Sequence, residues 1–195
     1  ETSINNHTDG LYEIICKAIQ TAADRVRAYH AKQLPQDLSF NDDLKSTLGY
    51  MWKPLETVGI YVPGGTASYP STVLMNAIPA MVAGVKDIVM ASPLTDGQIN
   101  PSVLYAAKIV GIKKIYCMGG SQAVAAMAYG TESVAPVNKI VGPGNIYVAE
   151  AKRQVSGFVG IDMFAGPSEI VVISDQNSDP KIISADLIAQ SEHDK

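Results

Sequence analysis

The 195-residue chain is 47% hydrophobic and only 17% charged, which supplies apolar material for a buried core in one or two domains and argues against disorder. Its formal net charge of −4 predicts no basic surface, so nucleic-acid partners are not expected. Because Pro79, Lys86 and Asp87 interrupt the most hydrophobic stretch, residues 73–89, no apolar run is long enough to span a bilayer, and no membrane partner is expected.

The cysteine content and the chain ends suggest a cellular setting. Cys16 falls in a predicted helix and Cys117 in a predicted apolar strand, where a structural thiol is the favoured interpretation. Two such cysteines do not indicate a disulfide framework, and a reducing cytoplasm fits best. Residues 1–10 are polar and lack the features of a signal peptide. The chain begins without Met and ends within a helical pattern, so we expect both ends to be cut.

The first predicted element is an amphipathic helix over residues 11–29, because its apolar residues recur at the spacing of one helical stripe. The stripe consists of Leu11, Ile14, Ile15, Ala18, Ile19, Ala22, Val26 and Tyr29. Residues 32–55 have mixed polarity and contain Pro35 and Pro54, which predicts a connector with one short helix at most.

From residue 58 onward, short β-rich runs alternate with helical runs, which is typical of a parallel sheet in a Rossmann-like α/β domain. Strands are predicted over residues 58–62, 88–91, 114–117 and 139–141, and helices over residues 71–84, 101–111, 121–129 and 145–156. A loop over residues 164–167 then leads to a predicted strand over residues 169–174, which we assign to a second sheet, and to a helix from about residue 179 to the end.

Two glycine-containing turns follow predicted strands. Residues 63–65, Pro-Gly-Gly, lie between a strand and a helix, where backbone N–H groups could approach an anionic ligand. A tight turn is the favoured explanation from the pattern alone, because no G-x-G-x-x-G follows. After residues 142–144, Gly-Pro-Gly, Asn145 could cap the next helix or hold a ligand with its amide, and capping alone is sufficient. Gln122 lies in the first turn of a helix on the usual ligand side of a parallel sheet.

The C-terminal part offers two further candidates. Ser168 is either a turn residue or an exposed hydroxyl contact, and it does not fit a hydrolase nucleophile because Pro precedes it and a predicted strand follows. Gln190 and His193 share one helical face at i, i+3 spacing and could bind one ion together. Zinc normally takes four ligands, so spacing alone favours a solvated histidine here.

Six blocks of the sequence, taken in order, resemble the histidinol dehydrogenase family. They are GIYVPGGTA at residues 59–67, STVLMN at 71–76, IVGPGN at 140–145, AKRQV at 151–155, IDM followed by AGPSE at 161–169, and DLIAQSEHD at 186–194. The resemblance runs from about residue 11 to residue 195, which is under half of a typical family member. It implies a cytoplasmic homodimer that oxidises L-histidinol to L-histidine through the aldehyde, reducing two NAD, in the last two steps of histidine biosynthesis.

The resemblance also implies a fold and a set of site residues. The expected architecture is a Rossmann-like domain (residues 59–165) inserted into a second α/β domain. Residues 1–58 would belong to that second domain, and the chain would return to it at residues 166–195, where it is truncated. By position, Tyr61, Gln122 and Asn145 resemble the family's NAD contacts. Ser168, Gln190 and His193 resemble its substrate contacts, and the last two also resemble its zinc ligands.

The same resemblance implies that this chain lacks part of the machinery. The family's other two zinc ligands and its catalytic Glu–His pair lie beyond residue 195, so no catalytic residue is assigned and this chain alone is expected to be inactive. Glu192 is adjacent to a residue that resembles a ligand, but it is not assigned as the catalytic base, because neighbouring helix positions face different directions. Two alternatives remain open: a naturally short, non-catalytic NAD-binding remnant, and a related dehydrogenase for another amino alcohol.

Overall fold

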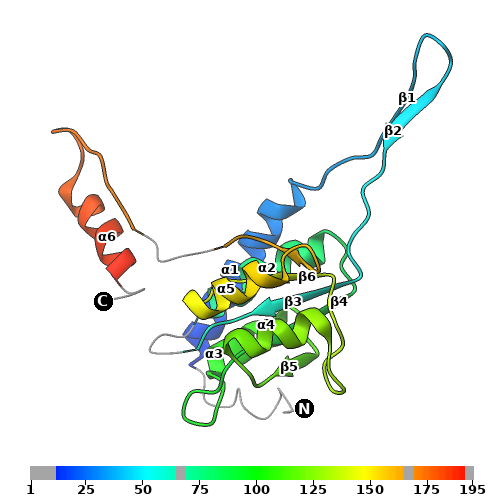
Figure 1. The fold of residues 1–195 in the computed structure, drawn as a ribbon. Coiled ribbons are helices and arrows are strands. Elements are labelled where there is room, and N and C mark those ends of the chain that lie inside the picture. Colours follow the sequence, from blue (N-terminus) through cyan, green and yellow to red (C-terminus); the bar gives the residue numbers. More distant parts are fainter. Residues whose placement is uncertain (1–11, 65–68, 165–168, 192–195) are drawn as a thin grey trace.

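A computed structural model describes residues 12–64, 69–164 and 169–191. Its centre is a parallel five-stranded sheet with the strand order β5-β4-β3-β6-β7 (Figure 1). The strands are β3 (Thr57–Tyr61), β4 (Asp87–Ala91), β5 (Lys114–Tyr116), β6 (Lys139–Val141) and β7 (Gly160–Ile161). The predicted α/β class with a parallel sheet is confirmed, and β3, the first of these strands in the chain, lies in the middle of the sheet.

Helices cover both faces of the sheet because the chain first runs outward from β3 to β5 and then reverses toward β7. Right-handed crossovers place the connecting helices on one face before the reversal and on the other face after it. On one face, α1 packs against α2 and α3, which follow β3 and β4. On the other face, α4 and α5, which follow β5 and β6, pack against each other. The bounds are α1 (Glu13–Ala31), α2 (Pro70–Val82), α3 (Pro101–Ile109), α4 (Gly120–Tyr129) and α5 (Ile146–Val155). We call this sheet with its five helices the sheet domain.

The side-chain alternation of β3 divides the core in two. Val58, Ile60 and Val62 pack into the cluster under α1, α2 and α3. Tyr61 points to the other face and joins the cluster under α4 and α5. Because successive residues of a strand face opposite sides, one strand that is buried on both faces supplies both cores. This alternation decides that Tyr61, at the end of β3, lies beneath α4 rather than beneath α2.

Residues 32–55 contain a β-hairpin where a connector with at most a short helix was expected, so that prediction missed the two strands. Strands β1 (Leu38–Asn41) and β2 (Thr47–Tyr50) pair antiparallel, and the hairpin extends away from the sheet domain (Figure 1). The turn is built by Asp42, whose carboxylate accepts hydrogen bonds from the backbone N–H groups of Leu44 and Ser46. Such side-chain to backbone bonds stabilise a reversal without the glycine that usually signals one.

The predicted strand over residues 169–174 is also wrong, because these residues adopt no regular structure. A strand needs a neighbour to hydrogen-bond with, and in the described residues nothing pairs with this segment. The second sheet is instead the β1–β2 hairpin. The final helix is confirmed as α6 (Pro180–Ser191), which stands apart from the sheet domain in Figure 1. The short strand β7 was not predicted.

The first predicted helix is confirmed, but its apolar stripe is only partly buried. Ile19 and Ala23 are in the core, whereas Ile14 and Tyr29 remain largely exposed. Cys117 follows the end of β5 and is exposed, which corrects its predicted place inside an apolar strand. Among the residues that the structure describes, no helix has both the length and the apolar character needed to cross a membrane.

Candidate functional site

The candidate site lies at the C-terminal edge of the parallel sheet. All five strands of the sheet run in the same direction, so the loops that follow them meet at one edge. The chain passes from β3 outward to β4 and β5, then returns to place β6 on the other side of β3. Loops leaving β3 and β6 therefore diverge to opposite faces, and this topological switch point is where open α/β sheets bind ligands.

Tyr61 connects the end of β3 with the start of α4. Its side chain is buried, and its hydroxyl oxygen accepts a hydrogen bond from the Gly120 N–H at 2.9 Å. The predicted site residue Tyr61 is thus held in place, and within the described part of the chain its hydroxyl proton has no acceptor and is available to donate. Gly120 has a φ of +69°, a conformation that favours glycine.

Three loops at this edge approach one another closely around Pro93, which follows β4. A Cβ added at Gly64 would lie 2.8 Å from the Pro93 ring, and one added at Gly119 would lie 2.7 Å from it. Only hydrogen fits at both glycines, so the loops after β3, β4 and β5 pack as one layer. Close packing against Pro93 therefore explains the glycine at position 64, while Gly65 lies outside the described residues and the predicted tight turn stays untested.

Gln122 is exposed in the first turn of α4, as its position predicted. Its amide folds back over Gly120, where an added Cβ would lie 2.9 Å from the Gln122 Oε1 atom. Among the described residues, the one hydrogen bond of this amide is long, at 3.5 Å, and comes from the Ser121 hydroxyl to the Oε1 atom. The amide nitrogen of Gln122 has no hydrogen-bond partner in the described part of the chain, which leaves a donor at the edge of the sheet.

Asn145 caps α5, which confirms the simpler of its two interpretations. Its Oδ1 atom accepts from the backbone N–H groups of Tyr147 and Val148, both at 3.1 Å. Capping uses only the amide oxygen. The Nδ2 group has no partner among residues 12–64, 69–164 and 169–191, and the side chain is exposed. The cap thus orients a free amide donor outward from the loop after β6, so capping and ligand binding are compatible.

The loop that carries Asn145 begins at Gly142, where the backbone is unusually constrained. Gly142 has a φ of +112°, and a Cβ there would lie 2.1 Å from the carbonyl oxygen of Tyr61. No other residue fits this conformation and this approach. Residues Tyr61 and Gly142 therefore bring the ends of β3 and β6 into contact at the switch point.

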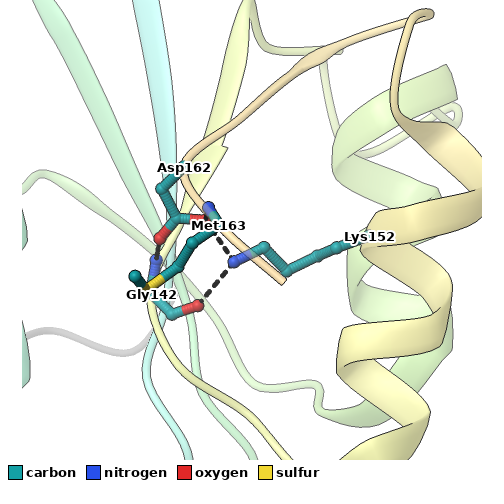
Figure 2. Close-up of polar contacts among 4 residues, drawn as sticks. All are labelled: Gly142, Lys152, Asp162 and Met163. Carbon is teal, nitrogen blue, oxygen red and sulfur yellow. Dashed lines mark hydrogen bonds and ion pairs between the residues drawn. The ribbon is translucent and has the colours of Figure 1, made fainter. Parts of the chain in front are cut away.

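Sequence reasoning missed two residues that hold this loop. Lys152 of α5 is 2% exposed and forms an ion pair with Asp162, directly after β7 (Figure 2). Lys152 is buried with Val148 and Val155 on the same face of α5. A lysine within an apolar helical stripe was the available signal, because buried lysines are rare unless they are paired.

The remaining predicted site residues are Ser168, Gln190 and His193. Gln190 lies on α6, which stands apart from the sheet domain, whereas Ser168 and His193 lie outside the described residues. No group of three or more His, Cys, Asp or Glu side chains that could hold a metal occurs in the described residues. The described geometry therefore supports a ligand site with amide and hydroxyl donors, and the metal prediction stays untested.

Comparison with known proteins identifies relatives over the whole chain. A family model described as histidinol dehydrogenase matches residues 1–195. A histidinol dehydrogenase from Agrobacterium fabrum is 60% identical over 181 residues, which is 93% of this chain and 42% of the relative. One from Brucella abortus is 55% identical over 194 residues, which is 100% of this chain and 45% of the relative.

A solved structure gives the same result. The crystal structure of histidinol dehydrogenase from Elizabethkingia anophelis matches with a TM-score of 0.92 and 43% sequence identity, over 97% of this chain and 44% of that one. The chain therefore spans less than half the length of each of these relatives.

Proposed function

Because the chain belongs to the histidinol dehydrogenase family, we propose that it supplies the NAD-binding part of an enzyme that oxidises L-histidinol to L-histidine in two NAD-linked steps. The observation that carries this proposal is the C-terminal edge of the sheet. At this edge, Tyr61 ends β3, Gln122 follows β5 and Asn145 follows β6. The three positions surround the switch point between β3 and β6.

The donors at this edge suit a dinucleotide. Gln122 and Asn145 each present an amide nitrogen without a partner in the described residues, and Tyr61 retains a hydroxyl proton. Ribose hydroxyls, phosphate oxygens and a carboxamide all accept such bonds. The side-chain space at Gly64 and Gly144 is taken by Pro93 and Val148, so these glycines allow the two loops that carry the site to pack closely. NAD, when bound, would accept the hydride, and these residues would bind and orient it.

We extend the proposal to zinc and substrate with Ser168, Gln190 and His193. Gln190 and His193 supply two ligands, whereas zinc takes four, or three with one water. This chain's proposed donors therefore do not complete a zinc site, and we derive no step through the metal. Gln190 lies on α6, and the role proposed for it requires that other residues come to that helix.

The domain division belongs to the same proposal. Residues 59–165 would form a domain inserted into a second α/β domain, to which residues 1–58 and 166–195 contribute. The hairpin and α6 support this division because both extend away from the sheet domain (Figure 1) and expose many apolar side chains, whereas α1 of residues 1–58 packs against α2 and α3 of the sheet domain. A homodimer in a reducing cytoplasm completes the proposal, and the two free cysteines are compatible with that setting.

The first experiment is a calorimetric titration of the 195-residue chain with NAD. We expect saturable binding that Gln122→Ala weakens by about tenfold, as for the loss of one or two hydrogen bonds. Gln20→Ala is the matched control, because Gln20 is an exposed glutamine on α1, on the other face of the sheet. Absence of NAD binding, or equal weakening by both variants, would contradict the proposed cofactor site.

The second experiment tests turnover and zinc in a protein of full family length. These residues replace the matching stretch of the Agrobacterium fabrum relative, and NADH formation from L-histidinol is measured after chelation and after zinc is restored. We expect zinc-dependent turnover, and we expect His193→Ala to lower the bound zinc. An active chimera with unchanged zinc content in His193→Ala and Gln190→Ala would refute the ligand assignment.

A further inference from the structure

The ion pair of Lys152 and Asp162 holds both backbone groups of a single loop residue, Gly142 (Figure 2). The Lys152 ammonium donates to the Gly142 carbonyl oxygen at 2.9 Å. The Gly142 N–H in turn donates to the Asp162 Oδ2 atom at 2.8 Å. The Met163 N–H donates at 2.7 Å to the Asp162 Oδ1 atom, the same oxygen that pairs with Lys152. We call these three interacting residues, Gly142, Lys152 and Asp162, the clamp.

The position of the clamp connects three elements at the proposed cofactor edge. Gly142 directly follows β6, Lys152 is on α5, and Asp162 directly follows β7. Gly142 is also the first residue of the loop that ends at Asn145, whose amide faces outward. Since Gly142 contacts the Tyr61 carbonyl, a shift of Gly142 would move both sides of the switch point.

Stability alone does not explain a charged clamp. Lys152 lies among apolar residues of α5, and burying an ammonium group is costly even when it is paired. Replacing a buried ion pair by apolar residues of similar volume is often neutral or stabilising. A methionine at position 152 would fill the same space, yet it could not hold the Gly142 carbonyl. The charged pair therefore specifies where Gly142 lies.

We propose that Lys152 and Asp162 are positioning residues that fix the loop of residues 142–145 in the conformation that receives NAD. The inference rests on the proposed function for the identity of the ligand. Neither residue is placed in contact with NAD. The ammonium of Lys152 is buried and bonded to Gly142 and Asp162, so it acts through the loop.

The first test needs no ligand. Amide hydrogen exchange is followed in the wild-type chain and in Lys152→Met. We expect the Gly142 N–H to exchange about tenfold faster or more in the variant, because Lys152 then holds neither the Gly142 carbonyl nor the Asp162 carboxylate. Amides of β3 and β4 should keep their rates. Unchanged exchange at Gly142 would overturn the clamp.

The second test titrates NAD into the same proteins. Lys152→Met should raise the dissociation constant about tenfold or more, as expected when a binding loop is displaced. Arg153→Met is the matched control, because it removes the neighbouring exposed ion pair with Glu150 on the same helix. Val155→Ala is the control for lost stability, because Val155 is buried on α5 and takes part in none of the clamp's hydrogen bonds. If either control weakens NAD binding as much as Lys152→Met does, the positioning role is refuted.

A double variant separates position from charge. Lys152→Met alone leaves the Asp162 carboxylate without its counter-charge, and repulsion of the NAD phosphates could then mimic a displaced loop. Lys152→Met with Asp162→Asn removes both charges and keeps the net charge of the wild type. Positioning predicts that NAD binding stays weak, whereas full recovery would show an effect of charge and overturn the proposal.

The two proposals can fail separately. If the wild-type chain binds no NAD, the proposed cofactor site and the ligand part of this inference both fail. The exchange rate of Gly142 would still decide whether the clamp holds the loop.

Discussion

The sheet domain differs from the two segments beside it in what surrounds its apolar residues. We call these segments, residues 33–55 and 169–191, the flanks. Ile60 on β3 is fully buried, whereas Ile173 in the second flank is 95% exposed. Both lie in runs rich in β-branched residues, so the difference arises from neighbours and not from composition. An apolar run predicts that a segment can be buried, but burial itself requires packing partners from other parts of the fold.

The largest expected effect comes from making the same isoleucine-to-alanine substitution once in the sheet domain and once in the second flank. Ile60→Ala should cost about 3 kcal/mol of unfolding free energy, because it removes buried methyl groups and leaves a cavity. Ile173→Ala should cost less than about 0.5 kcal/mol, because the side chain is in solvent. Urea denaturation of the 195-residue chain measures both. Equal costs would show that the second flank is packed in solution.

Limited proteolysis compares the two regions as wholes. We expect the first cuts in the hairpin turn at residues 42–46 and in residues 169–179, because these segments are exposed. Mass spectrometry should then show a resistant product that contains β3 to β7. Early cutting between β3 and β7 within residues 69–164, at the rate of the flanks, would contradict the division.

Two helix caps inside the sheet domain refine the comparison further. Asn100 caps α3 by accepting from the Ser102 N–H at 2.9 Å, much as Asn145 caps α5. Replacing either asparagine by alanine should cost about 1 kcal/mol. Only Asn145→Ala should also weaken NAD binding, which calorimetric titration of both variants checks. A similar loss of affinity in Asn100→Ala would assign the effect to general destabilisation.

The smallest expected effect concerns the exposed surface of α5. Hydrogen bonds from Arg153 and Gln154 lower the pKa of the Glu150 carboxyl to about 2. A lowered folded-state pKa contributes stability above the ordinary carboxyl pKa, and this contribution is lost as pH falls toward about 2. Between those values the wild type should therefore lose slightly more stability than Glu150→Gln, as thermal melts at several pH values would show. Because all three side chains are exposed, a large difference would contradict the description of this surface.

Much of the sheet domain could be predicted from the sequence. Strand β6 was predicted with its observed bounds, and the five helices and the other three longer strands were placed to within a few residues. These elements are buried on one or two faces, so their hydrophobic period reports their environment. The flanks were predicted less well. The hairpin turn depends on the Asp42 side chain and on Lys45 with a φ of +63°, neither of which is a common hairpin signal.

The candidate site was predicted in part for a similar reason. Tyr61 was assigned only through the resemblance to the family, Asn145 was a candidate from its place after the Gly-Pro-Gly turn, and Gln122 from its place on the expected ligand side of a parallel sheet. Lys152 and Asp162 were missed because their pairing depends on how α5 and β7 meet. Lysine is exposed by default, and only its place between Val148 and Val155 in the stripe of α5 indicated otherwise.

The contact of Pro93 with Gly64 and Gly119 has a consequence for how this family can vary. Its ring occupies the space that a side chain at either glycine would need. A larger residue can enter at 64 or 119 only if position 93 first becomes smaller, so single changes at the glycines are blocked. Across related sequences, these three positions should therefore covary, and glycine should be replaced at 64 or 119 chiefly where proline has been lost at 93.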